Sequence, residues 1–293
     1  MYGILVDVRV GLEARFCYHT GLKNAATVEF GGMMAPRLIA CDVDGTLLPA
    51  GQVELSGKTV ELIRRVIEAG ITFVPASGRQ LTGLKKVFAP VGCVDAFVAE
   101  DGAISCVASE LVDAVPIDRD LGDELVRAVL AKPECELYVG GVETCYVQSD
   151  NAAFIDHLRT VLNFDVTIVD DATAVPEPYW KISAYHAAND PDFDYWAGNF
   201  SNRCKVVLAG CDWIDMIAPG VSKAAGVAAV CRALGVDPAD CVAFGDADND
   251  VEMFELVGRS YAMESASEAA REAADETTAS VEEILERILA EIG

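Results

Sequence analysis

The sequence predicts an α/β protein with a Rossmann-like parallel sheet and an inserted α+β domain. Up to residue 113, short apolar runs alternate with segments of helical periodicity, and the same rhythm returns after residue 219. Such alternation is typical of a parallel sheet with crossover helices. Between these parts the pattern changes to mixed helices and alternating strands. We therefore expect a core domain of residues 34–113 and 219–293, with residues 114–218 inserted into it.

The first part of the core is predicted to begin with a buried strand and a helix. Leu38–Val43 is a continuous apolar run, which is typical of a strand covered on both faces. A helix follows from Ser56, with apolar residues on one face and Gly70 as its stop. The next predicted elements are the strand Ile71–Pro75, a helix near Gln80–Phe88 and the strand Ala96–Ala99.

The rest of the chain completes this pattern. Helices are expected at Ser222–Leu234 and Asp248–Leu256, on either side of a strand at Cys241–Phe244. Ser280–Ile292 has the apolar stripe of a helix that covers a core. In the inserted domain, alternating residues predict the strands Glu136–Val139, Cys145–Gln148, Val166–Val169 and Lys181–Tyr185.

Composition indicates a globular chain without a membrane span. Hydrophobic residues make up 52% and charged residues 24%, and no apolar run reaches the ~18–20 residues that span a bilayer. The first residues lack the cationic start and apolar core of a secretory signal, so we expect a cytoplasmic protein. Residues 1–33 lack the strand–helix rhythm. We favour a natural start at Met33 or Met34 over a genuine extension that packs on the core.

The ten cysteines fall singly, several within apolar runs, and no CxxC pair occurs. The three histidines lie far apart in the sequence. We therefore expect reduced, buried thiols and no zinc site.

The formal net charge is −25, and such a surface repels both nucleic acid and anionic membranes. We therefore expect neither as a partner. The same field repels a phosphorylated substrate. A phosphate site in this chain must therefore supply positive charge locally.

Four sets of polar residues follow predicted strands or begin a predicted helix. Ligands of an open parallel sheet bind beyond the carboxyl ends of its strands, so these sets can meet in one crevice. They are Asp42-Val43-Asp44-Gly45-Thr46, Ser77-Gly78-Arg79, Lys223 and Gly245-Asp246-Ala247-Asp248-Asn249-Asp250.

The chemistry of these residues suits phosphoryl transfer. The Asp42 carboxylate can attack phosphorus to give an acyl phosphate. Asp44 can protonate the leaving oxygen and then deprotonate the water that hydrolyses this intermediate. Gly45 lets the backbone turn sharply between them. Ser77 and Gly78 offer a hydroxyl and a backbone N–H to phosphate oxygens.

Positive charge comes from two sources in this interpretation. Lys223 is a compact cation that can pair with nucleophile and phosphate, and Arg79 adds to it. The carboxylates of Asp42, Asp246 and Asp250 beside a phosphate dianion also require a hard, oxygen-preferring cation. Mg²⁺ fits, because it uses few carboxylates and shares a phosphate oxygen.

In order and spacing these motifs resemble the haloacid dehalogenase-like (HAD) superfamily, specifically its Cof-type phosphatases. The resemblance covers roughly residues 37–290. It implies a Rossmann-like core, a cap inserted between the second and third motifs, and hydrolysis of phosphomonoesters. It also implies that Asp42, the backbone carbonyl of Asp44, and Asp246 hold Mg²⁺, with Asn249 and Asp250 supporting. By the same resemblance, Gly45, Thr46, Ser77, Gly78, Arg79 and Asn249 are expected to bind substrate.

Three positions depart from the family pattern. Many relatives have Asn where this chain has Asp101, and an acid there could alter how the leaving group is held. Relatives often have Gly after the motif lysine, where Ala224 stands here. Asp248 is an additional acid, interpreted as a solvated helix cap.

Several alternatives stay open at this stage. Asp44 favours phosphoryl transfer over dehalogenation, while a phosphomutase or a non-enzymatic phosphometabolite-binding protein remains possible. A small phosphorylated metabolite, such as a sugar phosphate, is the expected substrate. Candidate contacts in the cap are Tyr179, Trp180, Lys181 and Tyr185. Nothing in the sequence indicates the oligomeric state.

Overall fold

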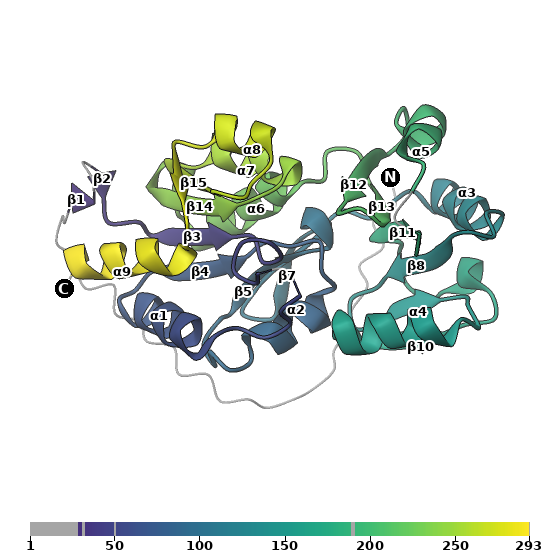
Figure 1. Cartoon of the computed structure of the whole chain (residues 1–293), viewed down its shortest axis with the longest axis horizontal. Coiled ribbons are helices and arrows are strands. Elements are labelled where there is room, and N and C mark those ends of the chain that lie inside the picture. The colour runs from purple at the N-terminus through teal and green to yellow at the C-terminus, as the bar shows by residue number, and fades with distance from the viewer. Residues whose placement is uncertain (1–28, 31–32, 50, 189–190, 293) are drawn as a thin grey trace, which may run out of the picture.

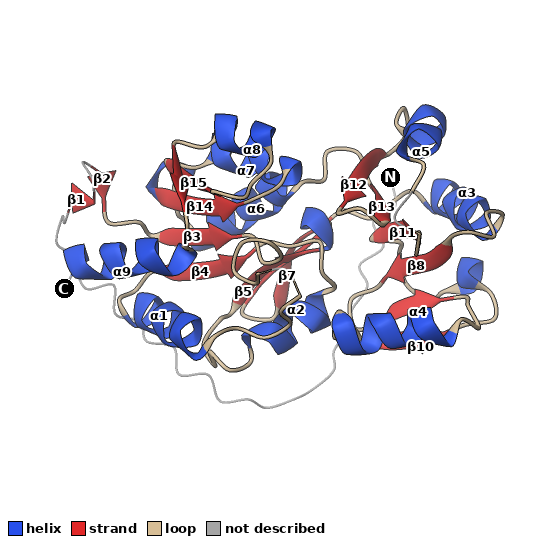
Figure 2. Ribbon diagram, in the orientation of Figure 1, coloured by secondary structure: helices blue, strands red, loops and turns tan. Residues whose placement is uncertain are grey.

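The computed structural model describes residues 29–30, 33–49, 51–188 and 191–292. Two lobes lie side by side, and each is built around a β-sheet (Figures 1 and 2). No helix in these ranges is long and apolar enough to cross a membrane. Most of the predicted N-terminal extension, residues 1–33, lies outside the described residues. Its described end contributes β1 (Glu29–Phe30), which pairs antiparallel with β2 (Met33–Met34).

The larger lobe is built on a five-stranded sheet in the order β16-β15-β14-β3-β4, and every pair in it is parallel. The predicted α/β core is therefore confirmed. All four residues of β3 are buried, because helices cover both faces of the sheet. The strands are β3 (Leu38–Cys41), β4 (Thr72–Pro75), β14 (Cys241–Gly245), β15 (Arg259–Met263) and β16 (Glu276–Thr278).

The covering helices begin and end where the sequence indicates. Ser56 caps α1 by accepting a hydrogen bond from the Thr59 N–H, and Gly70 follows the helix with φ +89°. The predicted helix at Asp248–Leu256 begins instead as a 3₁₀ turn at Asp248–Asp250 and becomes α7 afterwards. The helices of this lobe are α1 (Gly57–Glu68), α2 (Leu81–Phe88), α6 (Lys223–Leu234), α7 (Val251–Leu256), α8 (Glu268–Ala273) and α9 (Val281–Ile292).

A small antiparallel sheet extends the core sheet beyond β4. Its strands are β5 (Ala96–Ala99), β6 (Ile104–Val107) and β7 (Glu110–Ala114), and a bridge between Ala76 and Val98 joins β5 to the end of β4. The 3₁₀ turn Glu100–Gly102 follows β5. This turn matters for the site because it places two buried acids beside the loop after β4.

The smaller lobe consists of a six-stranded sheet in the order β10-β9-β8-β11-β13-β12, mostly antiparallel. All its strands come from residues 136–217, which fall within the segment 114–218 predicted as an insertion. They are β8 (Glu136–Gly140), β9 (Cys145–Val147), β10 (Val166–Ile168), β11 (Lys181–Tyr185), β12 (Lys205–Ala209) and β13 (Trp213–Ile217), accompanied by helices α3 (Arg119–Leu130), α4 (Ala152–Asp156) and α5 (Phe193–Phe200).

Polar contacts hold the smaller lobe, the predicted cap, against the larger lobe, the core. The buried amide of Gln80, at the start of α2, accepts from the Asp165 N–H (3.1 Å) and donates to the Asp165 carbonyl (3.3 Å). At a second point, Lys205 of β12 forms an ion pair with Glu252 of α7 (2.7 Å). The two lobes thus meet on both sides of the carboxyl ends of the core strands.

Candidate active site

The loops after β3 and β14 place the first and the fourth predicted motifs together. Asp42 directly follows β3, and its N–H donates to the Phe244 carbonyl of β14 (2.9 Å), so the two strand ends stay in register. The chain then turns at Gly45, whose φ is +86°. A Cβ at this position would lie 2.2 Å from Oδ2 of Asp246. Only glycine therefore allows the turn to pass this close to the Asp246 carboxylate.

Lys223 lies at the centre of the site, on the first turn of α6. Its Nζ donates to Asp42 Oδ1 (2.6 Å) and to Asp250 Oδ1 (2.7 Å), and all three side chains are buried. Burial alone would lower the pKa of the ammonium, but the neighbouring carboxylates outweigh it and raise that pKa above its ordinary value. The lysine is therefore a fixed positive charge beside Asp42.

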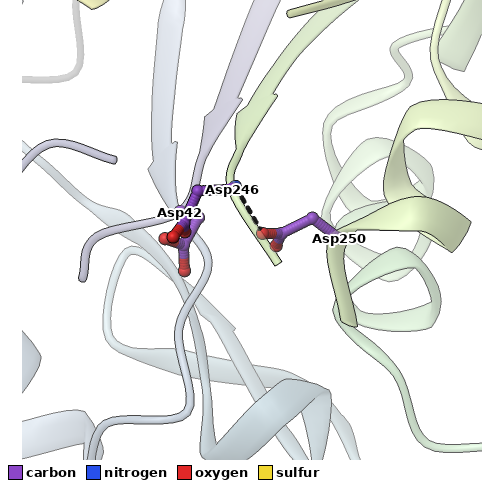
Figure 3. A group of neighbouring side chains, drawn as sticks. All are labelled: Asp42, Asp246 and Asp250. Carbon is purple, nitrogen blue, oxygen red and sulfur yellow. Dashed lines mark hydrogen bonds between the residues drawn. The ribbon is translucent and has the colours of Figure 1, made fainter. Parts of the chain in front are cut away.

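Asp42, Asp246 and Asp250 form a group of acids suited to a hard cation. One carboxylate oxygen of each lies within 4.8 Å of the others, and Figure 3 shows the three side chains converging. Oδ2 of Asp42 is buried without a hydrogen-bond partner, and burial raises the pKa of this carboxyl well above its ordinary value. An orphaned carboxylate oxygen beside further acids is what a divalent cation would satisfy, so these residues fit Mg²⁺.

The three acids do not offer their oxygens equally. Oδ2 of Asp250 accepts from the backbone N–H groups of Asp246 (3.0 Å) and Ala247 (3.1 Å), while its Oδ1 is held by Lys223. The dashed line in Figure 3 marks the first of these bonds. Asp246 accepts from the Thr46 hydroxyl (3.1 Å). Asp250 therefore shapes the loop, whereas Asp42 and Asp246 keep oxygens free for a cation.

Asp44 forms a bidentate pair with Arg79. Nε of the arginine donates to Oδ2 (2.7 Å) and Nη2 to Oδ1 (2.6 Å). The guanidinium is buried, but the side chain of Asp44 is 53% exposed. Asp44 thus stands at the wall of the cavity, where it can reach a ligand, and Arg79 orients it.

The loop after β4 carries Ser77 and Gly78 to the same place. Ser77 is buried and accepts a hydrogen bond from the Arg79 N–H (3.1 Å). Gly78 lies against Asp101: a Cβ there would be 3.0 Å from Asp101 Oδ2, so a larger residue would require Asp101 to shift by a few tenths of an ångström. Both line the cavity with Asp42 and Asp44. The Thr46 hydroxyl donates to Asp246 Oδ1 (3.1 Å), and its contact with substrate stays a prediction.

A buried ion cluster joins the cap to this loop. The ammonium of Lys181, on β11, lies 3.0 Å from Asp215, 3.1 Å from Glu100 and 3.5 Å from Asp101, and it also donates to the Gly78 carbonyl (2.5 Å). We call these four side chains the Lys181 cluster. Burial raises the pKa of Asp215 to about 6. Three acids share one ammonium, so the cluster carries excess negative charge.

The Lys181 cluster also reaches Lys223, the partner of Asp42. Nδ2 of Asn249 donates to Asp101 Oδ1 (3.3 Å), so its Oδ1 faces Nζ of Lys223 (3.4 Å). The acid at Asp101 therefore fixes the orientation of the Asn249 amide. The other two departures are accommodated. Ala224 lies in the first turn of α6. Asp248 is exposed as expected, but it is the first residue of the 3₁₀ turn rather than its cap, and it accepts from the Ser267 hydroxyl.

A cavity of about 880 Å³ lies between the lobes at this point. Among the four predicted cap contacts, only Lys181 lines it. Tyr179 is buried and bonds to Asp123, Trp180 donates to Glu177, and Tyr185 packs on Phe154 and Trp213. The cap residues that sequence reasoning missed include Tyr138, Phe164, Lys205, Asp212 and Trp213, which also line the cavity. They come from separate elements, so no local spacing could have indicated them.

The chain belongs to the haloacid dehalogenase-like hydrolases, whose family model matches residues 39–286. This confirms the resemblance seen in the motifs. It is 30% identical over 253 residues to the 5-amino-6-(5-phospho-D-ribitylamino)uracil phosphatase YbjI of Escherichia coli, covering 80% of this chain and 87% of that protein. It is 26% identical to an HMP-PP phosphatase of Cronobacter sakazakii, covering 78% and 85%. The chain is a phosphatase of this family.

Solved structures agree with the fold. A crystal structure from Eubacterium rectale superimposes with a TM-score of 0.74 at 28% identity, covering 86% of this chain and 98% of that one. A subclass IIB sugar phosphatase gives a TM-score of 0.72 at 17% identity over 85% and 98%. At that identity the second match concerns the fold alone.

Proposed function

We propose that this protein is a Mg²⁺-dependent phosphatase that hydrolyses a small phosphorylated metabolite through an aspartyl phosphate on Asp42. The observation that supports it most is the carboxylate of Asp42, buried, held by Lys223 on one oxygen and without a partner on the other. A carboxylate so fixed presents its second oxygen to the cavity region in which the other motif residues converge. The segment 114–218 acts as the cap in this proposal.

Each residue then has one task. Asp42 attacks phosphorus and the ester oxygen leaves with a proton from Asp44, which afterwards takes a proton from the attacking water. Arg79 keeps Asp44 oriented, while Lys223, Ser77 and the Gly78 N–H balance the charge on the phosphoryl oxygens. Asp42, Asp246 and the backbone carbonyl of Asp44 would hold Mg²⁺, which supplies further positive charge to the phosphate. The cap excludes water from the closed cavity.

The relatives guide the substrate only as a class. Those named above are phosphatases of an aminouracil ribityl phosphate and of HMP-PP. We infer that a sugar phosphate or a similarly small phosphorylated metabolite is turned over by this chain too. A cavity of about 880 Å³ accommodates a ligand of that size.

Hydrolysis of phenyl phosphate by the purified protein tests the mechanism. We expect Mg²⁺-dependent release of phosphate, and its loss in Asp42→Asn, because an amide cannot form the acyl phosphate. Asp44→Asn is the matched variant: turnover should fall by about 10²–10⁴-fold, the usual contribution of a general acid–base group, with Mg²⁺ binding retained. Full activity without metal, or unchanged turnover in Asp42→Asn, would contradict the proposal.

A further inference from the structure

The cavity has two ends of different character. At the core end lie Asp42, Asp44, Asp246 and Lys223, where the phosphoryl group is transferred in the proposed function. We call the other end the leaving-group end. It is lined by cap residues of β8, β11, β12, β13 and the preceding loops, namely Tyr138, Phe164, Lys181, Lys205, Asp212, Trp213 and Asp215. An alcohol attached to the phosphate would occupy this end.

Acidic side chains outnumber basic ones around the whole cavity. Eight carboxylates and four cationic side chains line it: Asp42, Asp44, Asp101, Asp212, Asp215, Asp246, Asp248 and Glu252, against Arg79, Lys181, Lys205 and Lys223. A bound Mg²⁺ offsets two of these charges, and the transferred phosphate adds its own. Nothing in this set reverses the negative sign of the walls.

Each of the four cations is already paired with an acid. Arg79 is bound by Asp44 (2.6 Å) and Lys223 by Asp42 (2.6 Å), both at the core end. At the leaving-group end, Lys181 is shared by three buried carboxylates. A ligand that paired with this ammonium would leave those carboxylates buried without a counter-charge.

Lys205 is the cation at the leaving-group end with the fewest partners. It bridges the lobes to Glu252 at 2.7 Å, and both side chains are partly exposed. While this pair is formed, the ammonium has an acid beside it and offers a ligand little net charge. The specificity of the leaving-group end therefore depends on whether Lys205 is neutralised by Glu252.

The aromatic residues of this end add a surface without charge. The Tyr138 ring lies 5.9 Å from that of Phe164 and 6.0 Å from that of Trp213, measured between centroids. Beside them, Asp212 and Asp215 can accept hydrogen bonds from hydroxyl or amino groups. An apolar surface flanked by acceptors suits a leaving group that is neutral or cationic and rich in donors.

Resting on the proposed function, we propose that the leaving-group end selects phosphomonoesters whose alcohol is uncharged or cationic, and that the Glu252–Lys205 pair rejects substrates bearing a second anion. Phosphomonoesters with a second anionic group on the alcohol, such as bisphosphates and phosphorylated acids, are accordingly poor substrates. Glu252 is thereby assigned as a specificity-determining residue that acts through Lys205.

Three aryl phosphates test this: phenyl phosphate, para-carboxyphenyl phosphate and para-(aminomethyl)phenyl phosphate. They carry the same phosphate and ring, with a neutral, anionic or cationic substituent at the far end. For the wild type we expect kcat/KM to be about tenfold lower for the anionic ester than for the cationic one, the scale of one like charge across a cavity. Differences in ring electronics cancel when the same ratios are compared between variants.

The variant Glu252→Gln frees Lys205 and should raise the ratio of kcat/KM for the anionic over the neutral ester by about fivefold, the order of one newly unpaired charge near the surface. Adding Lys205→Met to it should return the ratio to the wild-type value. Glu124→Gln is the matched control, because it breaks the ion pair of Glu124 with Arg203 (2.6 Å) outside this cavity and changes the net charge equally. There the ratio should not move.

The outcomes separate the two proposals. If phenyl phosphate is hydrolysed but all three esters react alike, or if Glu252→Gln leaves the ratio unchanged, the specificity assignment is overturned and the proposed function stands. A rise in Glu124→Gln equal to that in Glu252→Gln would overturn it as well, because bulk charge would then explain the effect. If none of the esters is hydrolysed with Mg²⁺ present, both proposals fail.

Discussion

Gly45→Ala is expected to damage the candidate metal site more than it damages the fold. The residue has φ +86°, so an alanine there is strained, and its Cβ would meet the Asp246 carboxylate at 2.2 Å from Oδ2 and 2.7 Å from Cγ. Ordinary contact begins near ~3.4 Å, so the acid must move by about 1 Å. That shift breaks its hydrogen bond from the Thr46 hydroxyl (3.1 Å).

The control for this substitution is Gly70→Ala. Gly70 has nearly the same backbone, φ +89°, but a Cβ there meets nothing within 4 Å. Both variants should lose about 1–2 kcal/mol of unfolding free energy from the left-handed backbone. Gly45→Ala should lose about 1.5–3 kcal/mol more, the usual contribution of a hydrogen bond to a charged group.

The assay is urea denaturation combined with a Mg²⁺ titration of phenyl phosphate hydrolysis. In Gly45→Ala the apparent Mg²⁺ affinity should fall by about 10–100-fold, the range found when a partner that orients a ligand is disturbed. In Gly70→Ala it should be unchanged. If both variants show the same stability and the same Mg²⁺ dependence, the collision with Asp246 is not what requires glycine at this turn.

Two further predictions concern the buried charges. Lys223→Met leaves the carboxylates of Asp42 and Asp250 without their ammonium, so unfolding free energy measured in urea without metal should fall by about 3–5 kcal/mol; a loss below about 1 kcal/mol would contradict the buried pairing described here. For Asp215, burial raises the pKa to about 6 from 3.8. Between those values the folded protein keeps a proton that the unfolded chain has released, so this group's contribution to stability falls as pH rises through that window and is constant above it. Comparing stability from pH 4 to 7 between wild type and Asp215→Asn tests this: the variant should lack that part of the slope, and identical slopes would show that Asp215 does not titrate there.

Local patterning predicted the core lobe well. The apolar run at Leu38–Val43 produced a buried strand because only a strand covered on both faces tolerates such a run. Asp42 and Asp246 could be assigned to one crevice because parallel strands point their carboxyl ends to the same edge. The family match to residues 39–286 confirms the superfamily that these motifs indicated.

Some features required the tertiary structure. Asp250 has the same side chain as Asp246, yet its oxygens are occupied by Lys223 and two backbone N–H groups, which spacing alone does not reveal. The cap contacts depended even more on packing, because residues 138, 164, 205 and 213 meet only after separate strands and loops are assembled. Tyr179 and Tyr185 are residue types that often contact ligands, but here both pack within the smaller lobe: Tyr179 is buried and Tyr185 lies against Trp213.

The sequence by itself determined which groups are predicted to carry the chemistry, because Asp42, Asp44 and Asp246 follow core strands, Lys223 begins a helix, and phosphoryl transfer needs such groups. Tertiary structure decided which of those groups are already paired, through contacts such as Arg79 with Asp44 and Lys205 with Glu252. The physical reason is that the order of strands in the sequence indicates which residues lie at the edge of the sheet. Their charge state and partners depend instead on side chains that the fold brings from distant elements.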